Sequence, residues 1–155
     1  MTDIDARLAE LGLALPEPAA PVAAYVPAVE AGGLLHVSGQ LPFIDGALVR
    51  GTLGDGIDVA AGAKAAQACG LMILAQVRAA LGGSFERVER VVKLGGFVAS
   101  TPGFTDQPKV VNGASELMVA VFGEAGKHAR SAVGVPALPL GAAVEVDAIL
   151  ALRPR

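Results

Sequence analysis

The stretch VAAGAKAAQACGLMILAQVRAAL, residues 59–81, decides the fold. It is rich in Ala and Leu and contains no Pro, a composition that favours a long helix over Val59–Leu81. Asp58 is suited to cap this helix, and Gly82-Gly83-Ser84 is expected to end it. A second long helix is predicted over Gln107–Phe122, stopped by the glycines that follow. Two such helices need a common apolar surface to pack on.

Strand-like segments on either side of the first helix supply that surface. The runs Ala24–Val29 and Leu34–Gln40 flank Ala31-Gly32-Gly33, which predicts a hairpin. The turn-rich loop Phe43–Gly56 contains one short strand over Ala47–Val49. A central strand is expected over Val88–Ser100, because Thr101-Pro102-Gly103 then breaks the pattern.

The end of the chain is predicted to form a second hairpin, with Arg130–Ala137 and Ala143–Leu152 joined by a Pro139-Leu140-Gly141 turn. Strands grouped in this way, with two helices sharing one face of a sheet, indicate an α+β fold rather than a doubly wound one. No repeat or linker divides the chain, so residues 1–155 are expected to form a single domain.

Residues 1–21 precede the first strand as an N-terminal helix and connector. Asp3–Leu13 is predicted as a short amphipathic helix with Ile4, Leu8 and Leu11 on one face. The proline-rich stretch Leu15–Pro21 cannot continue a helix and is expected to be a connector.

Composition narrows the class of protein. Of the 155 residues 53% are hydrophobic and 17% charged, an apolar surplus for a domain of this size. No run reaches the roughly 18 uninterrupted apolar residues that a membrane span needs, so we expect a subunit interface rather than a membrane to cover the surplus. The acidic N-terminus does not resemble a signal peptide, and the single Cys69 suits a reducing cytoplasm. A formal charge of −3 with scattered Lys and Arg disfavours nucleic-acid binding.

Arg130, Glu145 and Asp147 are the most informative polar residues. Side chains alternate along a strand, so Arg130 shares a face with Ala132, and Glu145 with Asp147. An arginine on an apolar strand needs a partner, and its planar guanidinium is well suited to a carboxylate. Spacing alone favours an internal ion pair with Glu145 or Asp147 over a bound ligand.

Other candidate residues give weaker signals. Ser38-Gly39 ends a strand, where the glycine permits either a bulge or close approach to a ligand. His36, His128 and Cys69 are too widely spaced for a zinc site. The paired glycines match no nucleotide-binding loop.

Four segments together carry a family resemblance: VSGQLP at 37–42, VN at 111–112, ARSAV at 129–133 and VEVDAI at 144–149. In this order they resemble the RidA/YjgF family of reactive-intermediate (enamine/imine) deaminases, over Tyr25 to Leu152. The N-terminal helix and residues 101–110 look longer than in compact members, as in a divergent longer subgroup.

The resemblance implies a chorismate mutase-like mixed sheet with two long helices on one face. It also implies a homotrimer with ligand pockets between subunits. The implied activity is hydrolytic deamination of small 2-imino or enamine acids, such as 2-aminoacrylate and 2-iminobutanoate, to 2-keto acids and ammonia. No metal or cofactor is implied.

By the same resemblance, Arg130 grips the substrate carboxylate and Glu145 places the attacking water. The pocket lining is implied to include Tyr25, Ser38, Gly39, Asn112 and Ala132. Ala132 stands where many members have Cys, so a backbone contact would survive there but a thiol role would not. The alternative is a non-catalytic protein that binds or senses a small carboxylate such as a 2-keto acid. A ribonuclease activity is disfavoured by the acidic charge balance.

Overall fold

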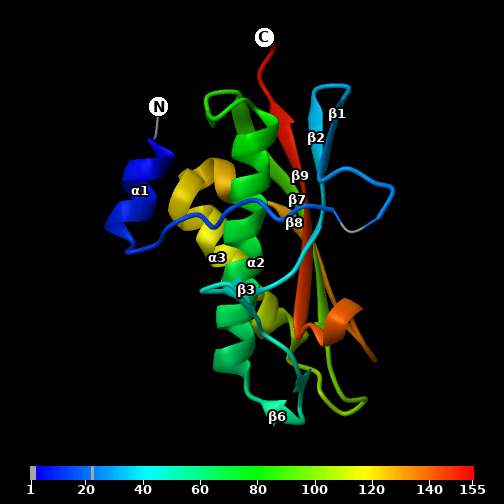
Figure 1. Cartoon of the computed structure of the whole chain (residues 1–155). Helices are drawn as coiled ribbons and strands as arrows, with labels where there is room; N and C mark the ends of the chain where they lie inside the picture. The colour runs from blue at the N-terminus through cyan, green and yellow to red at the C-terminus, as the bar shows by residue number, and fades with distance from the viewer. Residues whose placement is uncertain (1–2, 22) are drawn as a thin grey trace.

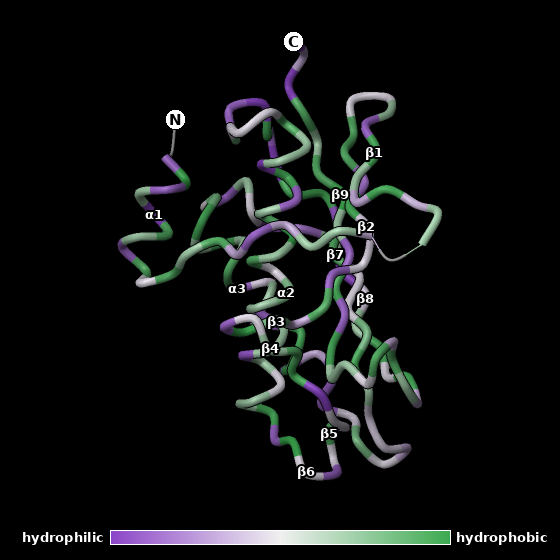
Figure 2. The backbone as a smooth tube through the Cα atoms, viewed as in Figure 1, coloured by the Kyte–Doolittle hydropathy of each residue, from purple (hydrophilic) through white to green (hydrophobic). Residues whose placement is uncertain are grey.

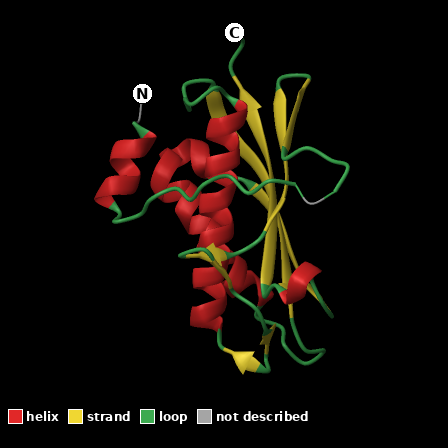
Figure 3. Cartoon of the chain, viewed as in Figure 1, coloured by secondary structure: helices red, strands yellow, loops and turns green. Residues whose placement is uncertain are grey.

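In the computed structural model, which describes residues 3–21 and 23–155, a five-stranded sheet carries two long helices on one side (Figure 1). The elements in chain order are α1 Ile4–Glu10, β1 Ala28–Ala31, β2 Leu34–Gln40, β3 Phe43–Ile44, β4 Ala47–Leu48, β5 Thr52–Leu53, β6 Gly56–Ile57, α2 Val59–Ala80, β7 Val88–Ala99, α3 Gln107–Phe122, β8 Ala129–Val135 and β9 Val144–Leu152. Short 3-10 turns follow α3 and β8, at Gly123–Gly126 and Pro139–Gly141. The helices form one layer and the sheet the other (Figure 3).

Helix α2 begins as its sequence predicts, because the carboxylate of Asp58 accepts a 2.8 Å hydrogen bond from the Ala61 N–H. By length and composition it could cross a membrane, yet 61% of its most apolar window is buried inside the fold. It packs closely on α3, and Gly113 of α3 lies directly against the backbone carbonyl of Ala63. The apolar helix is therefore a core element of this chain.

The order of strands in the sheet is β1-β2-β9-β7-β8. The predicted C-terminal hairpin is wrong, although both of its strands exist. Strand β7 lies between them, pairing parallel with β8 and antiparallel with β9. The long helix α3 spans the sheet from β7 to β8, and such a crossover is what a parallel pair requires. This leaves β8 as an edge strand.

The N-terminal hairpin is confirmed, but its first strand is displaced. Gly32 and Gly33 have φ values of +58° and +77°, as a two-residue turn between paired strands demands. Strand β1 begins only at Ala28, because the preceding Pro27 has no N–H to contribute to a ladder. Residues 23–25, where the predicted Ala24–Val29 strand should begin, form bends instead.

Helix α1 is shorter than the predicted Asp3–Leu13, and its tube alternates between hydrophilic and hydrophobic colours in Figure 2. Ile4 and Leu8 are buried, whereas Leu11 is exposed because the helix has ended before it. The connector that follows is tied to α2, where the Gln76 amide donates to the Ala19 carbonyl at 2.8 Å.

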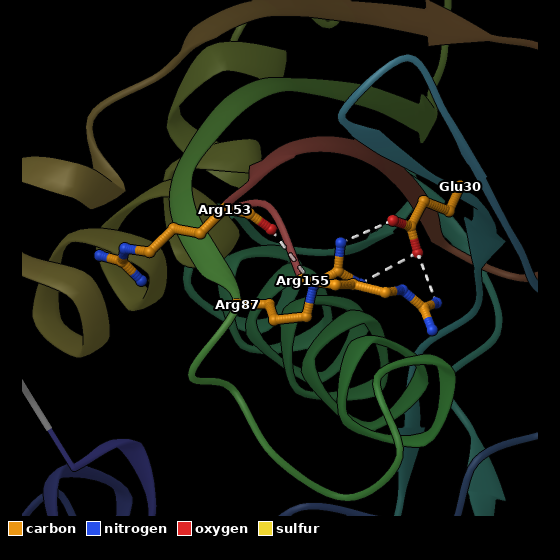
Figure 4. Close-up of polar contacts among 4 residues, drawn as sticks. All are labelled: Glu30, Arg87, Arg153 and Arg155. Carbon is orange, nitrogen blue, oxygen red and sulfur yellow. Dashed lines mark hydrogen bonds and ion pairs between the residues drawn. The ribbon is translucent and has the colours of Figure 1, made fainter.

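One end of the sheet is held by a charged cluster, which Figure 4 shows in detail. Arg87 donates from both terminal nitrogens to the two carboxylate oxygens of Glu30, at 2.7 and 3.1 Å. Arg155 adds a longer contact of 3.5 Å to the same carboxylate. The pKa of Glu30 is lowered, chiefly by the hydrogen bond from Arg87. This cluster joins the β1–β2 hairpin to the start of β7 and to the C-terminus.

Candidate functional site

Arg130 lies on the helix-facing side of edge strand β8. It is in register with Leu94 of β7, which is fully buried beneath the helices. Its Nη1 donates to Oδ1 of Asn112 at 2.8 Å and to Oγ of Ser115 at 3.2 Å. These two residues lie three positions apart on α3 and therefore project from one face of that helix. One side of the guanidinium is fixed in this way.

Within residues 3–21 and 23–155, Arg130 forms no ion pair, and its Nη2 and Nε make no hydrogen bond. The predicted pairing with Glu145 or Asp147 is wrong, because the intervening strand β7 separates β8 from β9. A half-buried guanidinium with two donors left over on one edge is arranged to receive a planar anion such as a carboxylate.

Glu145 lies on the opposite face of the sheet. Its neighbours Val144 and Val146 are fully buried towards the helices, so alternation turns Glu145 away from them. The carboxylate packs over Gly39, where an added Cβ would lie 2.9 Å from its Oε2. The register shift between Val37 and Gln40 shows that Gly39 also belongs to a bulge. Gly39 therefore leaves room for the Glu145 carboxylate, which a side chain at this position would have to displace.

The pKa of Glu145 is raised above its ordinary value, first by burial and then by repulsion from Asp147. Burial also raises the pKa of Asp147, although a hydrogen bond from the Gly95 backbone and the nearby Lys93 oppose this. A carboxyl whose pKa is shifted towards neutrality is better suited to accept and return a proton.

Ser38 precedes Gly39 in strand β2, and its hydrogen bonds reach the segment that follows Tyr25 in the chain. The Ser38 hydroxyl donates to the Val26 carbonyl at 2.8 Å, and its N–H donates to the Pro27 carbonyl at 2.9 Å. Ser38 thus fixes the segment that presents Tyr25, whose side chain is 48% exposed. Glu145, Gly39 and Ser38 are called the acidic cluster below.

The residues predicted to form a single pocket fall into two separate groups within this chain. Arg130 and Asn112 lie at the β8 edge on the helix side, whereas the acidic cluster lies on the other face, across β2 and β9. Strands β2 and β8 are separated by two others, so their axes lie roughly 14 Å apart at the usual strand spacing. Ala132 lies two residues beyond Arg130, partly buried against the core on the same side.

Two residues near Arg130 are not among the predicted site residues. The Ser115 hydroxyl contacts Nε2 of His128 at 2.9 Å, and Nδ1 of His128 lies 2.6 Å from the Gly126 carbonyl. The spacing of these residues in the sequence could have identified them. Ser115 is three residues after Asn112 on a predicted helix and so shares its face, and His128 is two residues before Arg130. From the sequence, His128 is weighed only as a zinc ligand.

Other features of the described residues lie away from both groups. No group of three or more His, Cys, Asp or Glu side chains gathers there as a metal site would require. Cys69 is fully buried, and burial raises the pKa of its thiol. A groove of about 760 Å³ on the helix side is lined by residues such as Leu15, Phe43 and Leu71, and none of the predicted site residues lines it.

Comparisons with known proteins agree with this architecture. Residues 5–151 match the family described as "YjgF/chorismate_mutase-like, putative endoribonuclease". Protein TCP17 of Trypanosoma cruzi is 54% identical over 97% of this chain and 94% of its own length. The crystal structure of Atu1372 from Agrobacterium tumefaciens, a protein described as of unknown function, has a TM-score of 0.91 at 50% identity, with 97% of this chain and 92% of that one covered.

A more distant relative has a small molecule bound. The E. coli protein TdcF, crystallised with bound serine, is 25% identical, with 89% of this chain and 94% of that one covered and a TM-score of 0.58. The family match extends over nearly the whole chain and includes both long helices and the five strands of the sheet, except for the last residue of β9. The chain belongs to the YjgF/RidA family.

Proposed function

We propose that this protein hydrolyses small reactive 2-imino or enamine acids, of the 2-aminoacrylate and 2-iminobutanoate type, to 2-keto acids and ammonia. The observation that carries the proposal is the Arg130 guanidinium, which is anchored on one side by α3 and has no acidic partner in the described chain. Such a group is prepared for the carboxylate that every 2-imino acid carries.

The chemistry needs few groups. A protonated imine is already electrophilic, so orientation and a placed water provide most of the acceleration. Arg130 holds the carboxylate through its Nη2 and Nε edge. Glu145 accepts a proton as water adds to the imine carbon, and returns it to the nitrogen. Glu145 then takes the hydroxyl proton of the tetrahedral intermediate as the C–N bond breaks, so that the carbonyl of the 2-keto acid forms, and the released ammonia carries this proton away as ammonium.

The proposed site takes its two halves from different copies of the chain. Arg130 and the acidic cluster face away from each other within one chain, so a single copy does not present both to one substrate. In a cyclic homotrimer, each β8 edge would meet the open sheet face of its neighbour. The exposed apolar residues Val26, Val29 and Val133 are the surface that such an association would cover.

Two properties of relatives bear on this proposal. The serine bound to TdcF is a small molecule with a carboxylate, which is the ligand class proposed here. The family description also mentions an endoribonuclease, a second candidate function that the net charge of −3 does not favour.

The decisive experiment adds the purified protein to a threonine dehydratase reaction and follows the loss of 2-iminobutanoate. We expect acceleration over the spontaneous rate, abolished in Arg130→Ala without loss of the folded oligomer. Binding of 2-oxobutanoate with no acceleration would instead indicate a carboxylate-binding or sensing protein. Cleavage of a generic single-stranded RNA that survives Arg130→Ala would favour the endoribonuclease.

A further inference from the structure

Arg130 stands at the end of a row of hydrogen bonds. Its Nη1 donates to the Ser115 hydroxyl at 3.2 Å, this hydroxyl contacts Nε2 of His128 at 2.9 Å, and Nδ1 of His128 lies 2.6 Å from the Gly126 carbonyl. A carbonyl oxygen only accepts, so Nδ1 carries a hydrogen, and in the tautomer that this selects Nε2 is the acceptor. The Ser115 hydroxyl therefore donates to His128 and accepts from Arg130.

All three donors in this row point the same way along it, from Arg130 to Gly126, and the Ser115 hydroxyl in the middle both accepts and donates. Hydrogen bonds aligned in this manner polarise and strengthen one another. The hydroxyl of Ser115 cannot turn away without abandoning either His128 or Arg130. The row thus selects one rotamer of the serine and one orientation of the guanidinium.

The far end of the row is itself immobilised. Gly126 lies so close to the backbone carbonyl of Met118, in α3, that no side chain would fit there. The next residue is fixed as well, since Nη2 of Arg90 donates to the Lys127 carbonyl at 2.6 Å. The carbonyl that orients His128 is therefore part of the packed fold.

We propose that Ser115 and His128 are positioning residues, which hold Arg130 with its Nη2 and Nε edge turned outward to receive a carboxylate. The identity of the ligand in this inference rests on the proposed function, whereas the arrangement of the three side chains does not. An arginine has several rotatable bonds, and ordering it on binding weakens affinity unless the protein has already ordered it. Neither residue touches the substrate in this arrangement.

Two pairs of variants test the inference. Ser115→Ala removes the hydroxyl, whereas Ser115→Thr retains it. His128→Ala removes the acceptor, whereas His128→Gln can still accept from Ser115 through its side-chain oxygen. Ser84→Ala is the matched control, because Ser84 accepts one local hydrogen bond, from the Glu86 N–H, and takes no part in the row from Arg130 to Gly126.

We expect Ser115→Ala and His128→Ala to raise the Kd for 2-oxobutanoate and the KM for 2-iminobutanoate by about 3- to 10-fold. The kcat should change by less than about 3-fold, since Glu145 is untouched. Ser115→Thr and His128→Gln should restore most of the affinity, and Ser84→Ala should match the wild type. Equal KM and Kd values in all variants, or equal losses in Ser84→Ala, would overturn the inference.

A second measurement does not depend on the reaction. Side-chain ¹⁵N relaxation of the Arg130 guanidinium reports its order directly, and it should show greater mobility in Ser115→Ala but not in Ser115→Thr. Unchanged order in Ser115→Ala would refute the positioning role. If the wild type neither binds 2-oxobutanoate nor hydrolyses the imine, the proposed function fails, while the relaxation data still decide the role of Ser115.

Discussion

At the scale of single residues, the surroundings of Glu145 in the folded chain disfavour its ionised form. Burial and the nearby Asp147 raise its pKa, so the folded protein binds its proton more tightly than the unfolded chain does. The stability that this group contributes is present below its ordinary pKa and is lost as the pH rises through the raised value. At neutral pH its charge therefore opposes folding.

Glu145→Gln should accordingly unfold at a higher temperature than the wild type at pH 7, with the difference vanishing as the pH falls below about 4. The same variant should lose activity by about 10²-fold or more, as removal of a general base does. Thermal melts over a pH series, alongside the imine assay, measure both effects. Glu124→Gln is a control of opposite sign, since the pKa of Glu124 is lowered by Lys127.

The residue scale also shows what sequence reasoning can and cannot predict of the site. Strand alternation correctly places Arg130 and Ala132 on one face, because that pattern is local. The partner of Arg130 depends on which strand lies next to β8, and no residue near Arg130 encodes this. The acidic partner expected for it is therefore wrong, although the arginine itself stands out in the sequence.

At the scale of elements, helices α2 and α3 pack closely at Gly113 of α3, where a larger residue would meet the backbone of Ala63 in α2. Alanine normally stabilises a helix relative to glycine by about 1 kcal/mol. Gly113→Ala should nevertheless destabilise this protein, because the new Cβ would collide with the backbone carbonyl of Ala63.

We expect the loss for Gly113→Ala to be about 1–3 kcal/mol, the usual range for overpacking, measured by urea denaturation. Gly103→Ala is the matched control, since nothing lies within 4 Å of the position that its new Cβ would take and its φ is not positive. Equal midpoints for the two variants would show that α2 and α3 can move apart.

The charged cluster at the sheet end predicts a pH effect opposite to that of Glu145. The pKa of Glu30 is lowered by Arg87, so its contribution to stability is present above the ordinary pKa and is lost as the pH falls through the lowered value. Glu30→Gln should melt below the wild type at pH 7 and together with it in strong acid. A constant gap across that range would exclude an electrostatic origin.

The helices and strands that are predicted best are those whose ends are marked clearly by nearby residues. Helix α3 and strand β2 have the bounds that the sequence predicts, because apolar periodicity, Pro and Gly mark both ends. Strand β1 begins later than its apolar composition suggests, because Pro27 outweighs that composition. Strand β7 lies between β8 and β9 because it pairs with both over long distances in the sequence. Local sequence signals do not reveal such pairing, so the neighbouring strands β8 and β9 wrongly suggest a hairpin.

At the scale of the whole molecule, the open face of the sheet exposes apolar side chains such as Val29 and Val133, which we expect another subunit to cover. Val133→Arg, on this face, is expected to convert an oligomer to monomers and to abolish imine hydrolysis. Light scattering after gel filtration measures the first effect. Val119→Arg is the control, because Val119 is also exposed but lies on helix α3.

Arg130 and Glu145 face opposite sides of one sheet, and this separation has a genetic consequence. Two null alleles, Arg130→Ala and Glu145→Ala, should complement each other when they are co-expressed. With random mixing of subunits, about one quarter of the sites would receive Arg130 from one product and Glu145 from the other. Arg130→Ala and Asn112→Ala should not complement each other, because both substitutions damage the same half of the site. Complementation by the first pair but not by the second would show that the site is shared between chains and is not carried whole by each one.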